Sequence, residues 1–138
     1  MKLAPGMHSL PLRIKARKPW NSTGIEVAQG EQYTLQAKGK WIDLLIRRTA
    51  RGYPTEEAPA ASRSFLSRFE DSRRMPKENW FALVGTIGKD ESSAFVIGEE
   101  LVDWQPSGSG ELMCFANDVP GAYFNNFGSV TLTVTRIR

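Results

Sequence analysis

The sequence predicts an all-β protein in which two sheets pack as a sandwich, and three observations support this. Short apolar runs recur along the chain and are separated by turns that contain Gly or Pro. Several of these runs alternate apolar with polar residues, which is the period of a strand with one buried face. The length of 138 residues suits one core, so we expect a single domain over residues 1–138.

The first third of the chain predicts three strands. Residues 10–16 alternate apolar and polar side chains, and Pro11 favours a sheet edge because proline cannot donate a backbone hydrogen bond. Residues 21–24 predict a turn, followed by a short strand at 25–27. Residues 33–37 alternate again and predict a half-buried strand.

The middle segment, residues 42–78, has no clear strand period and is interrupted by three prolines. We expect it to be mostly a long basic loop, which in a small domain is often functional. Residues 60–74 are rich in helix formers, and Phe65, Leu66 and Phe69 fall on one helical face. This pattern predicts a short helix lying on the sandwich.

Strand-like runs return in the second half of the chain. They are expected at 80–88, 95–98, 101–104, 111–116 and 130–135.

The net charge of +3 is unevenly spread. Residues 1–18 carry five basic residues and no acid, and residues 47–77 carry eight basic residues against four acids. Such runs usually form a solvated surface. They would also attract anionic partners such as phosphates or acidic glycans.

Catalytic residues are scarce. Cys114 is the only cysteine and lies in an apolar run, so we expect a buried thiol and no internal disulfide. His8 is the only histidine and lies near the N-terminus, which argues against Ser-His-Asp or Cys-His catalysis and against a Cys/His zinc site. The acids at 99–103 are better explained by a solvated strand end than by a glycosidase pair. We therefore expect a protein that is not an enzyme.

No apolar run approaches the roughly 20 residues needed for a transmembrane helix. Residues 1–10 lack the basic start and continuous apolar stretch of a signal peptide. We expect a protein that is cytoplasmic as synthesised, and export by a non-classical route stays open.

The most informative stretch is the predicted loop at 117–126, between two expected strands. It holds one carboxylate and three carboxamides, from Asn117, Asp118, Asn125 and Asn126, around a Pro-Gly turn. Ca²⁺ prefers several oxygen ligands of these kinds. Asn and Asp are also common in turns because they bond their own backbone, so a purely structural turn is the alternative.

The order of residues in this loop resembles a known family. Residues 117–121, Tyr123, 125–126 and 128–129 resemble the PA-IL-like lectins, which are bacterial calcium-dependent galactose-binding lectins with a small jelly-roll β-sandwich fold. Weaker matches, all in predicted strands or the turns beside them, occur at 30–39, 82–88 and 110–112. The resemblance covers about residues 14–136 and implies a jelly-roll sandwich.

The resemblance implies calcium ligands at five positions. Asp118, Asn125 and Asn126 match the family's side-chain ligands, and Ala122 matches a backbone carbonyl ligand. Counting onward from the early strand puts the second carbonyl at Asp43, whose carboxylate would add a negative ligand and strengthen Ca²⁺ binding.

The resemblance also implies where a sugar would bind. In the family, two adjacent sugar hydroxyls complete the coordination of the calcium ion. The implied sugar-binding residues are Asp43, Asp118, Val119, Ala122 and Asn125.

Departures from the family pattern leave the sugar open. The family fixes galactose with a His and a Gln from the middle loop, and residues 42–78 contain neither. Phe124 and Phe127 replace small residues and would stack on a sugar, crowd the site or pack on a neighbour.

Basic residues offer another specificity. Arg47, Arg48, Arg51 or Tyr53 could line the site instead, and arginines would favour an acidic sugar. The predicted ligand is therefore a galactose-like or acidic glycan. Trp41 is the best tryptophan candidate for the site because it precedes Asp43, whereas two others, at 80 and 104, are expected in the core.

Two other functions compete with calcium-dependent sugar binding. One is a metal-free interaction or oligomerisation module that keeps the lectin sandwich. The other is a polyanion or nucleic-acid binder acting through residues 47–77, which ranks last because basic and aromatic residues do not interleave as in single-strand binders. No nucleic acid is therefore expected as a partner. A homo-oligomer would suit a lectin, since several weak sites together raise avidity.

Overall fold

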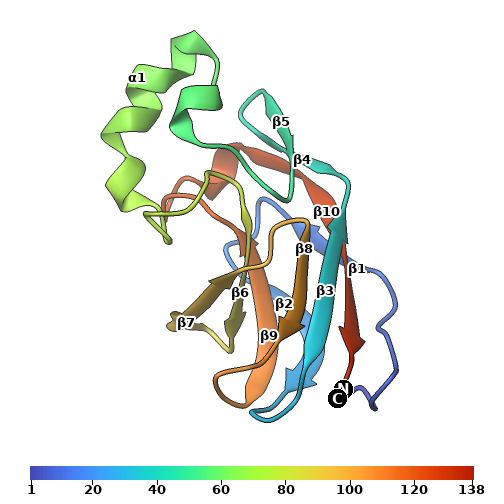
Figure 1. Cartoon of the computed structure of the whole chain (residues 1–138). Coiled ribbons are helices and arrows are strands. Elements are labelled where there is room, and N and C mark those ends of the chain that lie inside the picture. Colours follow the sequence, from blue (N-terminus) through green and yellow to red (C-terminus); the bar gives the residue numbers. More distant parts are fainter.

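Two antiparallel β-sheets pack face to face in the computed structural model, which describes residues 1–138 (Figure 1). One sheet has the order β5-β4-β10-β3-β8, with β1 also paired to β10, and the other has the order β2-β9-β6-β7. The strands are β1 (Leu12–Lys15), β2 (Asn21–Val27), β3 (Tyr33–Lys38), β4 (Lys40–Asp43), β5 (Ile46–Thr49), β6 (Leu83–Ile87), β7 (Asp90–Val96), β8 (Glu100–Trp104), β9 (Gly110–Ala116) and β10 (Asn126–Arg136). The helical elements are α1 (Ala60–Arg68) and the 3₁₀ turns η1 (Thr55–Glu57), η2 (Glu70–Ser72) and η3 (Tyr123–Asn125). The predicted all-β sandwich is confirmed.

The core forms where the alternating faces of the strands meet. Leu132 and Val134 of β10 are fully buried and pair in register with Ala37 and Leu35 of β3. The intervening threonines of β10 are less buried, so the period of two in the sequence does mark the two faces of this strand. Cys114 is buried on β9, where burial raises the pKa of its thiol and keeps it protonated.

Strand β2 begins earlier than the sequence predicts. Residues 21–24 were expected as a turn, but they are paired with β9 through Asn21 and Ser22. The register shifts between Ser22 and Glu26, and Gly24 has a φ of +72°, so turn-type residues sit inside the strand as a local irregularity. The buried Asn21 side chain also bonds the backbone of Lys15 and Cys114, which ties the start of β2 to its neighbours.

The middle segment is more ordered than a loop. A strand, β5, pairs with β4 as a hairpin, and its sequence Ile-Arg-Arg-Thr shows no period because only Ile46 is buried. The predicted helix is confirmed as α1, ending at Arg68, but it projects from one end of the sandwich rather than lying on a sheet face (Figure 1). Of its predicted apolar face only Leu66 is buried, while Phe65 and Phe69 pack against each other and are 57% and 38% exposed.

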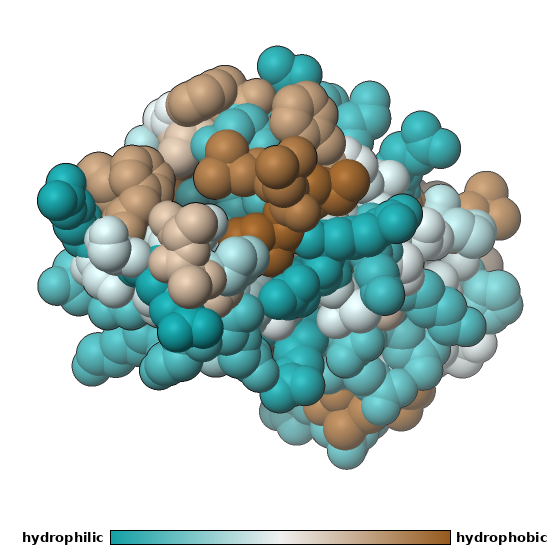
Figure 2. Space-filling model, turned by 90° about the horizontal axis from the view of Figure 1, so that it is seen from above, coloured by the Kyte–Doolittle hydropathy of each residue, from teal (hydrophilic) through white to brown (hydrophobic).

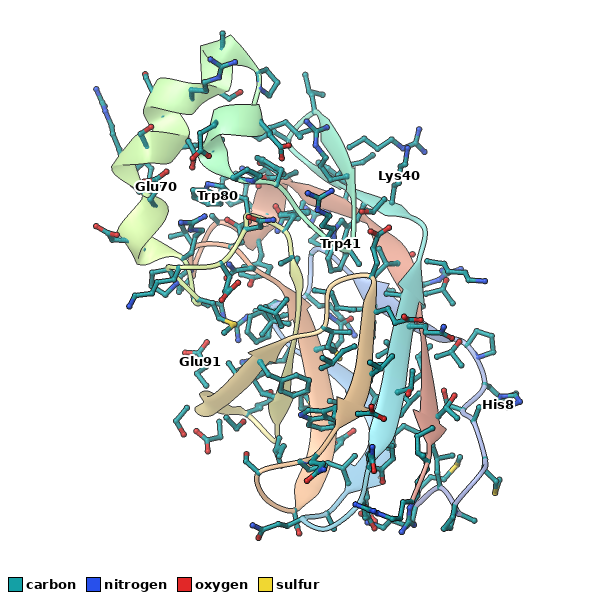
Figure 3. All side chains as sticks on the ribbon, viewed as in Figure 1. His8, Lys40, Trp41, Glu70, Trp80 and Glu91 are labelled. Atoms are coloured by element: carbon teal, nitrogen blue, oxygen red, sulfur yellow. The ribbon has the colours of Figure 1, made fainter.

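The prediction that Trp41 belongs to the site is wrong. Trp41 was the candidate for the site, but it is fully buried in the core, where its Nε1–H donates to the Phe81 carbonyl at 3.1 Å. Figure 3 shows Trp41 between the sheets and Trp80 beside the helical segment. Side-chain direction decides this, because β4 turns Trp41 inward and Asp43, two residues later, to the same side.

The two ends of the sandwich carry different features. The β4–β5 hairpin, α1 and the loop before β10 lie at one end, and the N- and C-termini lie together at the other (Figure 1). Backbone hydrogen bonds from Gly6 to Arg136 and from Gln32 to Arg138 hold the terminal segments there. No helix has the length and apolar character needed to cross a membrane.

Candidate functional site

The loop between β9 and β10 is anchored by its first residue. Asn117 is fully buried, and its amide bonds the backbone of Met75, Glu78 and Asn79. This side chain therefore holds the segment after η2 against the sandwich, and it is not available to a ligand. Asn117 has a structural role, but it acts on backbone 38 to 42 residues away rather than on its own turn.

Strand pairing brings Asp43 to the loop. Asp43 of β4 lies opposite Asn126 of β10 in register, and the Leu44 N–H donates to the Asn125 carbonyl at 3.1 Å. Asp43 therefore lies beside the loop, as the count from the early strand predicted. Only 5% of Asp43 and 3% of Asp118 is exposed, so two carboxyl groups are buried at this end of the sandwich.

Each carboxyl group has hydrogen-bond donors but no cation. The Asp43 Oδ2 accepts from the Tyr53 hydroxyl at 2.8 Å. The Asp118 Oδ2 accepts from Asn126 Nδ2 at 2.9 Å, and its Oδ1 accepts from the Val119 N–H at 2.7 Å. No Lys or Arg forms an ion pair with either acid.

This environment shifts the pKa of both acids upward. Burial, and then the charge of Asp43, raise the pKa of Asp118 to about 7, although the bonds from Asn126 and Val119 oppose this. Burial also raises the pKa of Asp43, against the opposing effect of the Tyr53 hydroxyl. Buried carboxylates are costly because the protein solvates them less well than water does, and a like charge nearby adds to the cost.

Two buried amide oxygens at the same place have no donor. They are Oδ1 of Asn125 and Oδ1 of Asn126. Buried polar atoms in folded proteins are nearly always hydrogen-bonded, so each such atom needs an explanation. Two carboxylates and two unpartnered amide oxygens form a set of hard oxygen donors that fits Ca²⁺.

A pocket of about 300 Å³ opens beside these groups. All five residues predicted to bind sugar line it: Asp43, Asp118, Val119, Ala122 and Asn125. The other wall is apolar, and half of its members come from the helical segment; of the six, the sequence indicated only Phe124. Its members are Leu44, Phe65, Leu66, Phe69, Trp80 and Phe124. Figure 2 looks down on this end of the molecule, where hydrophobic side chains gather next to hydrophilic ones.

Several other candidates lie elsewhere. Arg47, Arg48 and Arg51 do not line this pocket, and the fully buried Tyr53 lies behind Asp43. Phe127 lies outside the pocket, where Arg17 stacks on its ring at 5.5 Å.

Only two of the five predicted metal ligands, Asp43 and Asp118, are acids. Nowhere do three or more His, Cys, Asp or Glu side chains gather as a metal-binding group. A metal here would therefore depend on amide and carbonyl oxygens as well as on Asp43 and Asp118.

Comparison with known proteins gives a fold likeness. No protein-family model matches the sequence, and no curated protein matches it. Among solved structures, the chain is similar to the N-terminal domain of EclA, described as a PllA-like lectin, with a TM-score of 0.66. The chain shares the fold of this lectin domain. The match covers 94% of this chain and 97% of that domain at 18% sequence identity, so it extends over the whole sandwich and concerns the fold alone.

Proposed function

We propose that this protein binds carbohydrate through a calcium ion and is not an enzyme. The observation that carries the proposal is the pair of buried carboxyl groups, Asp43 and Asp118, beside two buried amide oxygens without donors. The proposed calcium ligands are the side chains of Asp118, Asn125 and Asn126, the carbonyl of Ala122, and Asp43 through its carbonyl and carboxylate.

A cation would resolve the unfavourable electrostatics of this site. Burial raises the pKa of both acids, the charge of Asp43 raises the pKa of Asp118 further, and neither acid has a positive partner. A bound divalent ion reverses that effect, since it stabilises both carboxylates and removes their protons. The same ion accepts the lone pairs of the Asn125 and Asn126 oxygens.

The donor set favours calcium over other metals. Every proposed ligand is an oxygen, and no imidazole or thiolate lines the pocket, which argues against zinc or copper. Ca²⁺ tolerates irregular sets of carboxylates, amides and carbonyls, whereas Mg²⁺ demands near-ideal octahedral geometry.

The pocket beside the site suits a sugar. A calcium ion supplies a strong attraction for two adjacent hydroxyls, which a neutral sugar could not obtain in water from hydrogen bonds alone. Asp118 and Asn125 line the polar side and would bond the same hydroxyls. Phe124, which is 68% exposed, offers an aromatic face to the C–H side of a sugar ring. The pocket contains neither the His nor the Gln with which the PA-IL-like lectins fix galactose, so galactose is one candidate among related sugars.

The Val119 backbone has a smaller part in this proposal. Its N–H already donates to Asp118 Oδ1, so it positions the carboxylate. The Val119 side chain packs against the core and contributes to the pocket wall.

Thermal unfolding in excess Ca²⁺ and in EDTA tests the metal. A ligand at 100 times its Kd adds about 2.7 kcal/mol, which for a chain of this size raises Tm by roughly 10 °C. We expect this shift in the parent, none in Asp118→Asn, and the full shift in the control Asp71→Asn, whose acid is exposed outside the pocket. Equal Tm values in the two buffers for the parent would overturn the calcium proposal.

A glycan array tests the ligand. We expect binding in calcium to galactose-like or acidic glycans, lost in EDTA and in Asp118→Asn. If calcium raises Tm but no glycan binds, the calcium site is structural and the proposal of carbohydrate binding is wrong.

A metal-free interaction module is the second candidate function. Exposed Leu45, Phe65 and Phe124 at this end of the molecule favour it. Sedimentation of the parent and of Phe124→Ser in EDTA distinguishes the two, because only the interaction module requires an assembly that weakens in the variant.

A further inference from the structure

A second depression, separate from the sugar pocket, lies between the β4–β5 hairpin and the η1–α1 segment. Its lining contains five cationic side chains, two acidic ones and no hydrophobic one. The cationic members are Lys40, Arg47, Arg48, Arg51 and Arg63, and the acids are Glu56 and Glu57. We name this depression the basic basin. Its member Lys40, at the start of β4, is labelled in Figure 3.

The positive charge of the basic basin is not neutralised within the protein. The ion pairs of the molecule join Lys2 and Arg136 to Glu31, and Arg74 to Glu91. None of the basin's cations has a carboxylate within 4.0 Å, although Glu56 and Glu57 lie in the same lining. Its guanidinium groups therefore keep donors for an external anion.

Two of the arginines are held in place. Arg48 donates to the carbonyls of Arg47 at 2.9 Å and Glu57 at 3.3 Å, and its guanidinium stacks on the Tyr53 ring at 5.4 Å. Arg63 Nε donates to the Ala58 carbonyl at 2.9 Å. Fixing these side chains before binding lowers the entropy that a ligand would otherwise lose in ordering them.

One buried side chain contacts a residue of the basic basin and a residue of the proposed calcium site. Tyr53 carries Arg48 on its ring and donates its hydroxyl to Asp43 at 2.8 Å. The basic basin and the proposed calcium site are therefore linked through this one side chain, and we take the glycan to be long enough to reach both.

We propose that the basic basin binds the sulfate or carboxylate group of an acidic glycan, an inference that rests on the proposed function. Arginine suits such groups because its planar fork donates two parallel hydrogen bonds to their oxygens. A nucleic acid is less suitable, since single strands are bound by stacking bases on aromatic side chains and the basin is lined by none.

The test compares a chondroitin sulfate tetrasaccharide with lacto-N-tetraose, a neutral tetrasaccharide, by calorimetry in calcium and in EDTA. The basin variant is Arg47→Gln with Arg51→Gln, two exposed side chains that make no hydrogen bond in the fold. The matched control is Lys77→Gln with Lys89→Gln, which removes the same charge outside the basin.

We expect the sulfated probe to bind more tightly than the neutral one, and the basin variant to weaken it about tenfold, or 1.4 kcal/mol. The control should change its affinity less than about twofold, and added salt should weaken it. Equal losses in variant and control, equal binding of the two sugars, or tighter binding of a single-stranded DNA oligomer than of the sulfated probe would each overturn the proposal.

The two proposals fail in different ways. If only the basin is wrong, the calcium shift in Tm persists and both sugars bind alike. If only the calcium site is wrong, the sulfated probe binds equally in calcium and in EDTA and the basin variant still weakens it.

Discussion

Two clusters of opposite charge lie at the same end of the sandwich and differ in their contact with water. Asp43 and Asp118, the acid pair, are almost fully buried without a cation, whereas Lys40, Arg47 and Arg51 of the basic basin are exposed. Water solvates the exposed charges at little cost, but the buried ones destabilise the fold unless a partner neutralises them. The acid pair should therefore control stability, and the basin should control only ligand binding.

The largest expected effect is on the pH dependence of stability, which calcium should remove. The pKa of Asp118 is raised in the folded state to about 7, so its protonated form stabilises the metal-free fold at low pH. That stability is fully present below the unfolded pKa and is lost as pH rises through the folded value. Unfolding of the EDTA-treated protein should cost about 2–3 kcal/mol less at pH 8 than at pH 5.

Calcium should remove this loss, because it competes with protons for the same oxygens and binds more tightly as pH rises toward about 7. Denaturant unfolding across this pH range, with and without calcium, measures both effects. Asp118→Asn should flatten the metal-free profile. A metal-free parent that becomes steadily more stable from pH 5 to pH 8 would contradict the buried acid pair.

A smaller effect is expected for Tyr53→Phe. The variant removes the donor to Asp43 Oδ2 and leaves a buried carboxylate without a partner. The metal-free protein should lose about 1–3 kcal/mol of unfolding free energy at pH 8. Calcium should restore part of this loss by neutralising Asp43, and an undiminished loss in calcium would place the metal away from Asp43.

Phe124→Ser should lower glycan affinity without changing the stability of the fold. Because Phe124 is 68% exposed, the unfolding free energy should change by less than about 0.5 kcal/mol. Glycan affinity should fall by several-fold, since the sugar loses an aromatic face worth about 1 kcal/mol. Phe127→Ser is the matched control, as this ring lies outside the pocket, and it should leave affinity unchanged.

The smallest effect on stability is expected in the basic basin. Arg47→Gln with Arg51→Gln should leave the unfolding free energy within about 0.5 kcal/mol of the parent, because both side chains are solvated. The two substitutions should weaken only the binding of acidic ligands. A destabilisation comparable to that of Tyr53→Phe would show that the two clusters do not differ in the way described.

Strand periodicity predicted most of the sandwich because a half-buried strand alternates apolar and polar residues along the sequence. Residues 33–37 and 130–135 alternate clearly, and both became central strands. Periodicity missed β4, most of β7 and β5, whose only buried residue is Ile46. It also missed the start of β2, where turn-type residues pair across an irregular register. Edges and bulges carry little alternation, so local pattern cannot find them.

The candidate site was predicted in part. The loop order found Asp118, Asn125 and Asn126, and counting from the early strand brought Asp43 to the same place. The apolar wall was missed because Phe65 and Phe69 reach the pocket only through the packing of α1, which no local pattern records. Trp41 was misjudged because its position near Asp43 in the chain did not indicate which way its ring points.

The position of the chain ends has a practical consequence for measuring weak binding. Both termini lie at the end of the sandwich opposite the β4–β5 hairpin and α1 (Figure 1), whose residues help to line the pocket and the basic basin. A biotin tag on either terminus would attach the protein to a sensor surface with its binding end facing the solution. Dense immobilisation would then imitate a multivalent array, so apparent affinities should rise with coating density for glycans that carry several copies of the recognised group.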